Sequence, residues 1–273
     1  TVLTAHPTQF YPGSVLGIIT DLTEALKSNN HIEIKDLLAQ LGKTPFFKKE
    51  KPTPFDEAVS LIWYLENVFY PTASEMVHYL QKNIFKGNEL KNDVLNLGFW
   101  PGGDRDGNPF VTTEITLKVA ERLRTSILKC YYTDIRKLKR KLTFTGVDVI
   151  IAELENKLYR SVFYSQGEIF ISLEEFKSQL LNIKNIIIEK HQSLYVDEVD
   201  LLLNKVNLFG FHFATLDIRQ NSKIHKAVFQ DIVQKEKSLF PADYFNLSET
   251  AKIDILSKAS AQLKASYFDN EIT

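Results

Sequence analysis

Three short apolar segments interrupt a largely helical sequence, and all three end in the same way. Residues 2–4, 97–100 and 211–216 have the apolar character of extended strands, and each runs into a polar or Gly/Pro-rich cluster followed by a helical pattern. In parallel α/β proteins the loops at the carboxyl ends of strands share one edge of the sheet and carry the chemistry. The sequence therefore predicts three parallel strands whose ends converge on one pocket. Separations of about a hundred residues exceed a usual βα connection, so several helices are predicted between successive strands.

Helical periodicity accounts for most of the remaining chain. Its clearest stretches cover residues 56–69, 113–142, 173–191, 197–206 and 249–264. Pro71 is expected to divide the first of these helices from the next one, and the basic, proline-bearing residues 43–54 are expected to form a connector. The pattern is typical of a mainly α protein with a few parallel strands.

Composition excludes several classes of function. Lys and Arg number 33 against 34 Asp and Glu, so no global field favours nucleic acid or an acidic membrane surface as a partner. No apolar run reaches the roughly 20 residues of a membrane helix. The single cysteine, Cys130, lies in an apolar helical stretch and can form no intramolecular disulfide, which indicates a reducing, cytoplasmic compartment. The chain begins with Thr1 inside a strand-like run, so we expect it to be cut from a longer protein.

His6 is the candidate that follows the first strand. Pro7 biases the backbone of His6 toward extended conformations. An imidazole fixed at a strand end can act as a base or an anion partner near neutral pH. A purely structural histidine before a proline is the alternative.

The loop at residues 101–109 follows the second strand and contains three glycines, two prolines and an Asp-Arg-Asp-Gly-Asn core. The backbone N–H groups of such a stiff loop can bind an anion. The alternative is a turn in which Arg105 is neutralised by Asp104 and Asp106. The glycine spacing fits neither a P-loop nor a dinucleotide fingerprint.

Arg219 follows the third strand, beside Asp217 and Gln220. A guanidinium at a strand end suits bidentate recognition of phosphate or carboxylate. An architectural pair of Asp217 with Arg219 is the alternative.

The other charged residues point less clearly to chemistry. The basic run at residues 136–141 is predicted to be a solvated helix face, with an anion-binding regulatory patch as the alternative. The histidines at positions 31, 78, 191 and 225 lack metal-ligand spacing, and neither a Cys/His cluster nor a Ser-His-Asp arrangement can be assigned. No metal ligand is predicted in this chain.

Taken together, three motifs resemble those of the bacterial and plant phosphoenolpyruvate carboxylases, in the same order. They are Thr-Ala-His-Pro-Thr at residues 4–8, Trp100 with Gly-Gly-Asp-Arg-Asp-Gly-Asn-Pro at 102–109, and Leu-Asp-Ile-Arg-Gln at 216–220. Residues 51–58 also resemble the family, and the resemblance spans nearly the whole chain. Family members are much longer and fold as an eight-stranded α/β barrel embedded in helices. The resemblance implies that residues 1–273 are one fragment, without an internal boundary, that supplies the first three barrel strands.

The resemblance also implies a reaction. Bicarbonate attacks the phosphate of phosphoenolpyruvate, giving carboxyphosphate and an enolate, and the carbon dioxide released next is captured by the enolate as oxaloacetate, which replenishes the tricarboxylic acid cycle. Such chemistry needs fixed cations for the phosphate, a divalent metal for the enolate and a dry pocket for carbon dioxide. By resemblance, His6 matches the catalytic histidine that helps carboxyphosphate break down, Arg219 a substrate-phosphate arginine, and Trp100 a wall of the carbon dioxide pocket. Arg105 is a further substrate-binding candidate.

The chain departs from the family pattern at two positions, and it lacks part of the family's active site. Pro101 stands where many members have Met, and Phe99 where a small polar residue is usual. The family's later Gly-rich loop and its acidic ligands for Mg²⁺ or Mn²⁺ are not among these residues. The resemblance implies a homo-oligomeric, metal-dependent parent enzyme acting on phosphoenolpyruvate and bicarbonate. Because part of the active site is missing from these residues, we expect the isolated chain to be inactive. The alternative is a non-catalytic helical module that binds an anionic metabolite or a partner chain.

Overall fold

A computed structural model describes residues 1–4, 11–46, 52–85, 95–164 and 170–259 of the chain. In this part the protein is mainly helical, with three short strands, as the sequence predicts. None of the helices in the described ranges is both long and apolar enough to cross a membrane. In chain order the helices are α1 (Gly13–Lys27), α2 (His31–Lys43), α3 (Pro54–Tyr64), η1 (Leu65–Phe69), α4 (Tyr70–Tyr79), η2 (Leu80–Ile84), α5 (Thr113–Lys139), α6 (Asp148–Phe163), α7 (Leu173–Lys190), α8 (Val196–Phe209), α9 (Ser222–Lys235), η3 (Tyr244–Asn246) and α10 (Glu249–Lys258).

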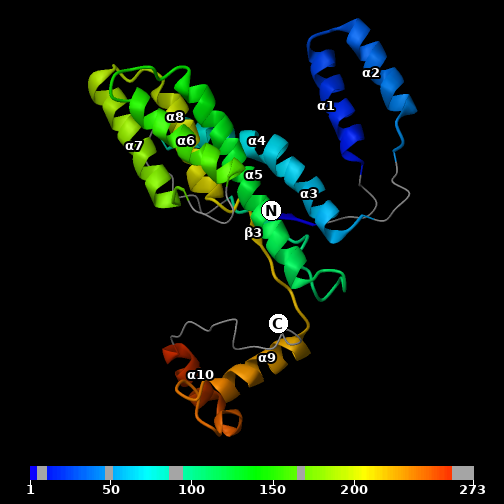
Figure 1. The fold of residues 1–273 in the computed structure, drawn as a ribbon, viewed down its shortest axis with the longest axis vertical. Helices are drawn as coiled ribbons and strands as arrows, with labels where there is room; N and C mark the ends of the chain where they lie inside the picture. The colour runs from blue at the N-terminus through cyan, green and yellow to red at the C-terminus, as the bar shows by residue number, and fades with distance from the viewer. Residues whose placement is uncertain (5–10, 47–51, 86–94, 165–169, 260–273) are drawn as a thin grey trace.

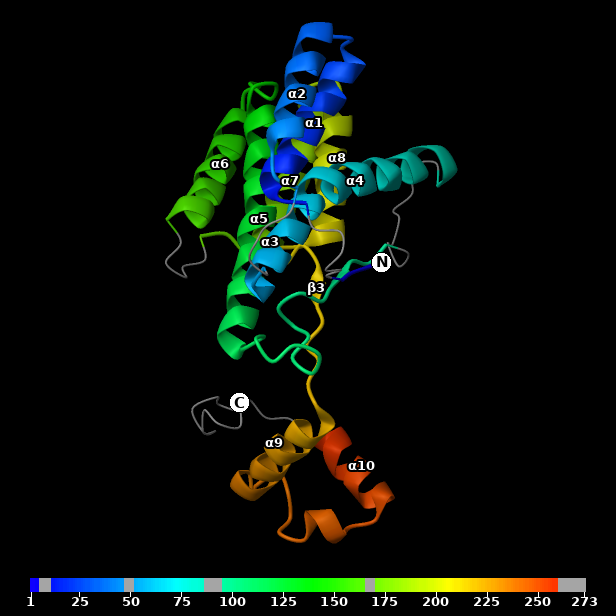
Figure 2. The same cartoon turned by 90° about the vertical axis from the view of Figure 1, so that its right-hand side faces the viewer.

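The strands form one parallel sheet in the order β1-β2-β3, where β1 is Val2–Leu3, β2 is Gly98–Phe99 and β3 is Thr215–Leu216. In register, Val2 lies opposite Gly98, and Gly98 lies opposite Thr215. The prediction of three parallel strands separated by inserted helices is confirmed. Figure 2 shows β3 running from the end of α8, past the loop before α5, toward α9.

Short polar side chains fix where the helices begin. The Thr53 hydroxyl accepts a hydrogen bond from the Asp56 N–H, and the Asp56 carboxylate accepts one from the Thr53 N–H, so α3 has a complete capping box. Thr112 and Ser172 cap α5 and α7 with one such bond each. Each cap satisfies an N–H group that has no partner within its own helix.

The prediction that Pro71 separates two helices is wrong. Helix α3 continues through η1 and α4 into η2, and Pro71 lies at the start of α4. The reason is the π-helical turn η1, in which the Tyr70 N–H donates to the carbonyl of Leu65, five residues back. A π turn widens the helix, so the proline ring and its missing N–H fall where the regular ladder is already interrupted. The side-chain amide of Asn67 donates to the Trp63 carbonyl at 2.8 Å and occupies one acceptor of this turn.

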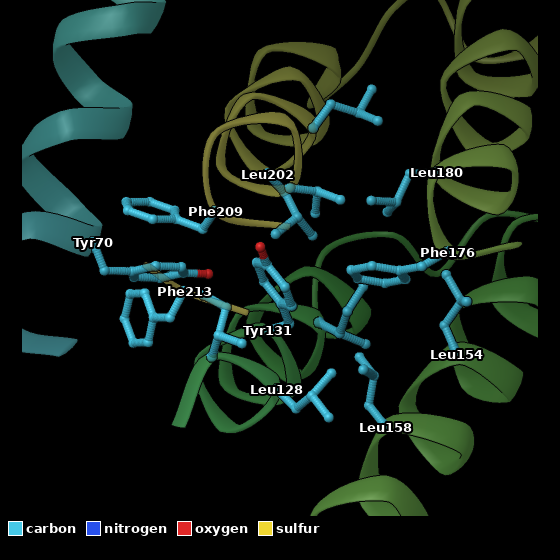
Figure 3. Packing of buried hydrophobic residues seen from close by; sticks show 14 of the residues in the cluster. Tyr70, Leu128, Tyr131, Leu154, Leu158, Phe176, Leu180, Leu202, Phe209 and Phe213 are labelled. Atoms are coloured by element: carbon cyan, nitrogen blue, oxygen red, sulfur yellow. The ribbon is translucent and has the colours of Figure 1, made fainter. Parts of the chain in front are cut away.

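An aromatic core holds the main helices together, with Tyr131 of α5 at its centre (Figure 3). The Tyr131 hydroxyl is fully buried and donates to the Gly210 carbonyl at 2.8 Å. Phe209 and Phe213 lie on either side of Gly210 in sequence, and both pack against Tyr70. This packing anchors the turn between α8 and β3, and so it fixes where β3 begins.

Ion pairs link α5 to the helices that pack around it. The Lys205 ammonium lies 2.6 Å from the Asp134 carboxylate, which also accepts a hydrogen bond from the Tyr70 hydroxyl at 2.8 Å. The basic run at residues 136–141 is exposed, as predicted for a solvated face, and it is also paired: Lys139 contacts Glu155 of α6, and Lys141 contacts Glu198 of α8. The run therefore ties α5 to its neighbours.

Figure 1 shows the α1–α2 hairpin and the segment from α9 to α10 apart from the central helices. Each of these two parts has a small apolar cluster of its own. The α1–α2 hairpin packs around Ile18, Ala25 and Leu37. The segment from α9 to α10 packs around Val233, Phe240 and Tyr244. That residues 1–273 form one undivided unit stays a prediction.

Cys130 is expected to be an inert thiol. Burial, aided by the nearby carboxylates of Glu66 and Asp134, raises the pKa of the Cys130 thiol from 9.0 to about 12. Only the thiolate reacts, so at pH 8 labelling by a disulfide reagent should be about a thousandfold slower than for an ordinary exposed thiol. Stopped-flow labelling of folded and urea-unfolded protein measures this difference. Equal rates in the two states would contradict the raised pKa of this partly buried thiol.

Candidate functional site

The second and third strands continue, past their ends, into two loops that are hydrogen-bonded to each other. The Asp217 N–H donates to the Phe99 carbonyl at 3.0 Å, which makes Trp100 and Asp217 neighbouring positions just beyond the strands. The β2 chain then turns, with the Gly103 N–H donating to the Trp100 carbonyl at 2.8 Å. Pairing resumes as a parallel bridge between Asp104 and Arg219. The β2 and β3 strand ends are thus held at one edge, as the sequence predicts.

Two glycines make this close approach of backbones possible. A Cβ on Gly103 would lie 2.0 Å from the Asp217 carbonyl oxygen. Gly102 has φ +85°, a left-handed conformation that disfavours side chains, and a Cβ there would lie 2.5 Å from Val119. The Gly102 carbonyl accepts a hydrogen bond from the buried Thr116 hydroxyl at 2.6 Å, which fixes the loop to α5. Gly103 therefore permits the contact between the two loops, and Gly102 permits the contact with α5.

Trp100 and Arg219, which the sequence predicts as site residues, lie against each other. The Arg219 guanidinium carbon is 5.0 Å from the centre of the Trp100 ring, a cation–π geometry. The Trp100 indole N–H donates to the Asp217 carboxylate at 2.9 Å. A half-buried aromatic wall and a cation therefore stand side by side at the strand ends.

The Arg219 guanidinium lies between two carboxylates of the β2 loop. Its nitrogens are 3.5 Å from Asp104 and 3.6 Å from Asp106, which is longer than a good charge-assisted hydrogen bond. The Arg219 side chain is 46% exposed. Loose pairing and exposure leave this guanidinium open to an incoming anion.

The proposed pairing of Asp217 with Arg219 is replaced by a different arrangement. The carboxylate of Asp217 accepts from Trp100, whereas Asp104 and Asp106 lie beside Arg219. The structure brings Arg105 to the same place through its backbone, since its N–H donates to the Arg219 carbonyl at 3.0 Å. A substrate-binding role for the Arg105 side chain stays a prediction.

The pKa of the Asp104 carboxyl is raised above its ordinary value. Its partial burial raises the pKa of the carboxyl, and the hydrogen bond with Asp106 raises it further, against the opposing charge of Arg219. Burial and the hydrogen bond with Asp106 favour the neutral Asp104 carboxyl, whereas the guanidinium of Arg219 favours the carboxylate.

The remaining candidates can be placed only in part. His6 lies outside the described residues, although the strand that precedes it in sequence, β1, is paired with β2. Within the described ranges no group of three or more His, Cys, Asp or Glu side chains could hold a metal ion. The described residues therefore do not form a site for the Mg²⁺ or Mn²⁺ that the resemblance implies.

Sequence reasoning assigned no functional role to Asp217 or Gly103. The register of β2 against β3 indicates a role for both residues. Once the strands ending at Phe99 and Leu216 are paired, Trp100 and Asp217 fall next to each other, and the adjoining loop must come close enough to require glycine.

Comparison with known proteins identifies a family that this chain matches over most of its length. The phosphoenolpyruvate carboxylase family model matches residues 1–162 and 149–265. The chain is 27% identical to the phosphoenolpyruvate carboxylase of Shewanella halifaxensis, covering 93% of this chain and 34% of that protein. For those of Shewanella loihica and Nitrosomonas eutropha the identities are 28% and 27%, over 85% and 97% of this chain and 32% and 34% of theirs.

The fold and the site thus define a class of protein: it is mainly helical, and the ends of two parallel strands bring a tryptophan and an arginine together. Because the family model matches most of its length, the chain belongs to the phosphoenolpyruvate carboxylase family. It spans about a third of the length of the curated relatives that it matches.

Proposed function

We propose that this chain forms one side of the active site of a longer phosphoenolpyruvate carboxylase, which makes oxaloacetate and phosphate from phosphoenolpyruvate and bicarbonate. The observation that carries the proposal is the meeting of Trp100 and Arg219, 5.0 Å apart, at the ends of two parallel strands. The reaction needs a fixed cation for a phosphate and a dry wall for carbon dioxide. This pair offers both at one place.

Each residue has a role in the proposal. Arg219 holds the phosphate of phosphoenolpyruvate, because its guanidinium is half exposed and only loosely paired with Asp104 and Asp106. Trp100 forms an apolar wall against which carbon dioxide is retained for the enolate. Arg105 is a second cation toward substrate. His6 assists the breakdown of carboxyphosphate.

The rest of the site comes from outside this chain. A divalent ion, Mg²⁺ or Mn²⁺, would stabilise the enolate, with ligands in the remainder of the longer protein. The order β1-β2-β3 with large helical insertions supports placing these strands as the first three of an eight-stranded barrel. We also propose a cytoplasmic, homo-oligomeric enzyme and an isolated chain without turnover.

Replacement of His6 tests the proposal in the whole enzyme. We expect His6→Asn to abolish oxaloacetate while some bicarbonate-dependent release of phosphate persists, because histidine acts after phosphoryl transfer. Phosphate and oxaloacetate are followed in parallel, with His31→Asn as a control because His31 is an exposed residue at the start of α2. Equal loss of both products would contradict the role of His6. Absence of both products from the unmodified whole protein would favour the non-catalytic alternative.

A further inference from the structure

We propose that Asp217 is a positioning residue, which fixes the indole of Trp100 and so sets the shape of the carbon dioxide wall. The inference rests on the proposed function of Trp100. Its structural part, that Asp217 holds the indole, stands on geometry alone. The hydrogen bond from the Trp100 indole N–H to the Asp217 carboxylate is 2.9 Å long and joins residues from two different strands.

The backbone of Asp217 is itself held on both sides. Its N–H donates to the Phe99 carbonyl at 3.0 Å, which extends the β2–β3 ladder. Its carbonyl oxygen packs so closely on Gly103 that no Cβ would fit between them. An aspartate side chain has only two torsions, so a fixed backbone presents the carboxylate at a well-defined point.

Trp100 is restrained in three directions by three different groups. Its backbone N–H donates to the Leu3 carbonyl of β1 at 3.0 Å, which fixes the start of the side chain. The Asp217 carboxylate holds the N–H edge of the indole, and the Arg219 guanidinium lies over the ring face. A hydrogen bond to a charged acceptor is stronger than a neutral one, so the contact with Asp217 is the directional restraint among the three.

The choice of Asp217 over the other acids follows from the contacts. Asp104 and Asp106 lie beside the guanidinium of Arg219, at 3.5 and 3.6 Å. The carboxylate that accepts from the indole N–H is that of Asp217. Without the Asp217 acceptor, the half-buried indole N–H must form its hydrogen bond with water. The ring then rotates, and water enters beside the apolar wall.

Fluorescence isolates the structural part of the proposal. The chain has two tryptophans, so Trp63→Phe leaves Trp100 as the one indole that emits. In that background Asp217→Ala should red-shift the emission, lower its anisotropy and increase quenching by acrylamide about twofold. Asp217→Asn, which keeps a neutral acceptor, should fall between Asp217→Ala and the parent. Asp106→Ala is the matched control, because it removes a neighbour of Arg219 and leaves the indole bond in place.

Activity tests the functional part in the whole enzyme. Asp217→Ala should lower the ratio of oxaloacetate to phosphate about tenfold, since carbon dioxide escapes from a wall that is no longer fixed. Asp36→Ala, at an exposed position on α2, should leave this ratio unchanged. A merely destabilising change would reduce both products together and would not move their ratio.

The outcomes separate this inference from the proposed function. Unchanged emission in Asp217→Ala overturns the positioning role and leaves the proposed function standing. A loosened indole with an unchanged product ratio overturns the assignment of Trp100 as the carbon dioxide wall. If circular dichroism shows that Asp217→Ala does not fold, the indole ¹⁵N–¹H resonance of Asp217→Asn decides instead: an upfield proton shift supports the bond, and an unmoved resonance overturns it.

Discussion

Alanine at position 103 is expected to separate the two loops of the site and to abolish oxaloacetate formation by the whole enzyme. The added Cβ would lie 2.0 Å from the Asp217 carbonyl oxygen, which is 1.4 Å short of the 3.4 Å at which ordinary contact begins. The obstacle is backbone, so no side-chain rotation relieves it. Overpacking and the loss of the bonds around Arg219 should lower the free energy of unfolding by roughly 3 kcal/mol.

Urea unfolding followed by circular dichroism measures this loss, together with an oxaloacetate assay on the whole enzyme. Gly17→Ala is the matched control, because Gly17 lies inside α1 with nothing within 4 Å of its added Cβ. Alanine is the better helix former, so the control should gain about 1 kcal/mol. A stability and activity of Gly103→Ala equal to those of the parent would contradict the close approach of the loops.

Substitution of Arg219 by lysine should lower both products of the whole enzyme together, by about ten- to a hundredfold. A point-like ammonium replaces a planar fork that can hold two phosphate oxygens, and a lost charge-assisted bond is worth roughly 1.5 to 3 kcal/mol. The damage falls on the first chemical step, so the ratio of oxaloacetate to phosphate should stay constant. This behaviour differs from that expected of His6→Asn and Asp217→Ala, which change the ratio.

The measurement is release of phosphate and of oxaloacetate over a range of phosphoenolpyruvate concentrations. Arg122→Lys, at an exposed position on α5, provides the control for a general effect of the substitution. Phosphate release that survives Arg219→Lys intact would remove Arg219 from phosphate binding.

Much of the fold could be predicted from local pattern. The three strand segments end before Trp100, Asp217 and the cluster that begins at residue 5, and the long amphipathic helices have the periodicity that the sequence shows. Parallel pairing followed from the shared order of strand, polar cluster and helix. The positions of the strands and helices depend on residues near one another in sequence, so the local pattern predicts them. Parallel pairing joins distant segments and is predicted only because the same order of segments recurs three times.

Partner choice within the site could not be predicted in the same way. The sequence places Asp217 two residues before Arg219 and so offers a pair between them as the alternative to substrate binding, yet the carboxylate accepts from Trp100, just beyond the neighbouring strand. That contact depends on the register of β2 against β3, and a one-residue slip would move every such partner. The role of Gly103 depends on the same long-range contact.

The error at Pro71 has a different origin. The rule that proline ends a helix assumes a regular α-helical ladder on its amino-terminal side, and η1 removes that assumption. No pattern rule for helix boundaries includes a π turn.

Pro71, at the start of α4, also affects the denatured protein. Proline restricts the backbone of an unfolded chain, so it reduces the conformational entropy that folding must remove. In most helices this benefit is outweighed by a clash and a lost hydrogen bond. Because η1 already provides a widened turn ahead of Pro71, the residue acts mainly on the denatured ensemble, where a rigid ring is worth about 0.4 to 1 kcal/mol in favour of the folded state.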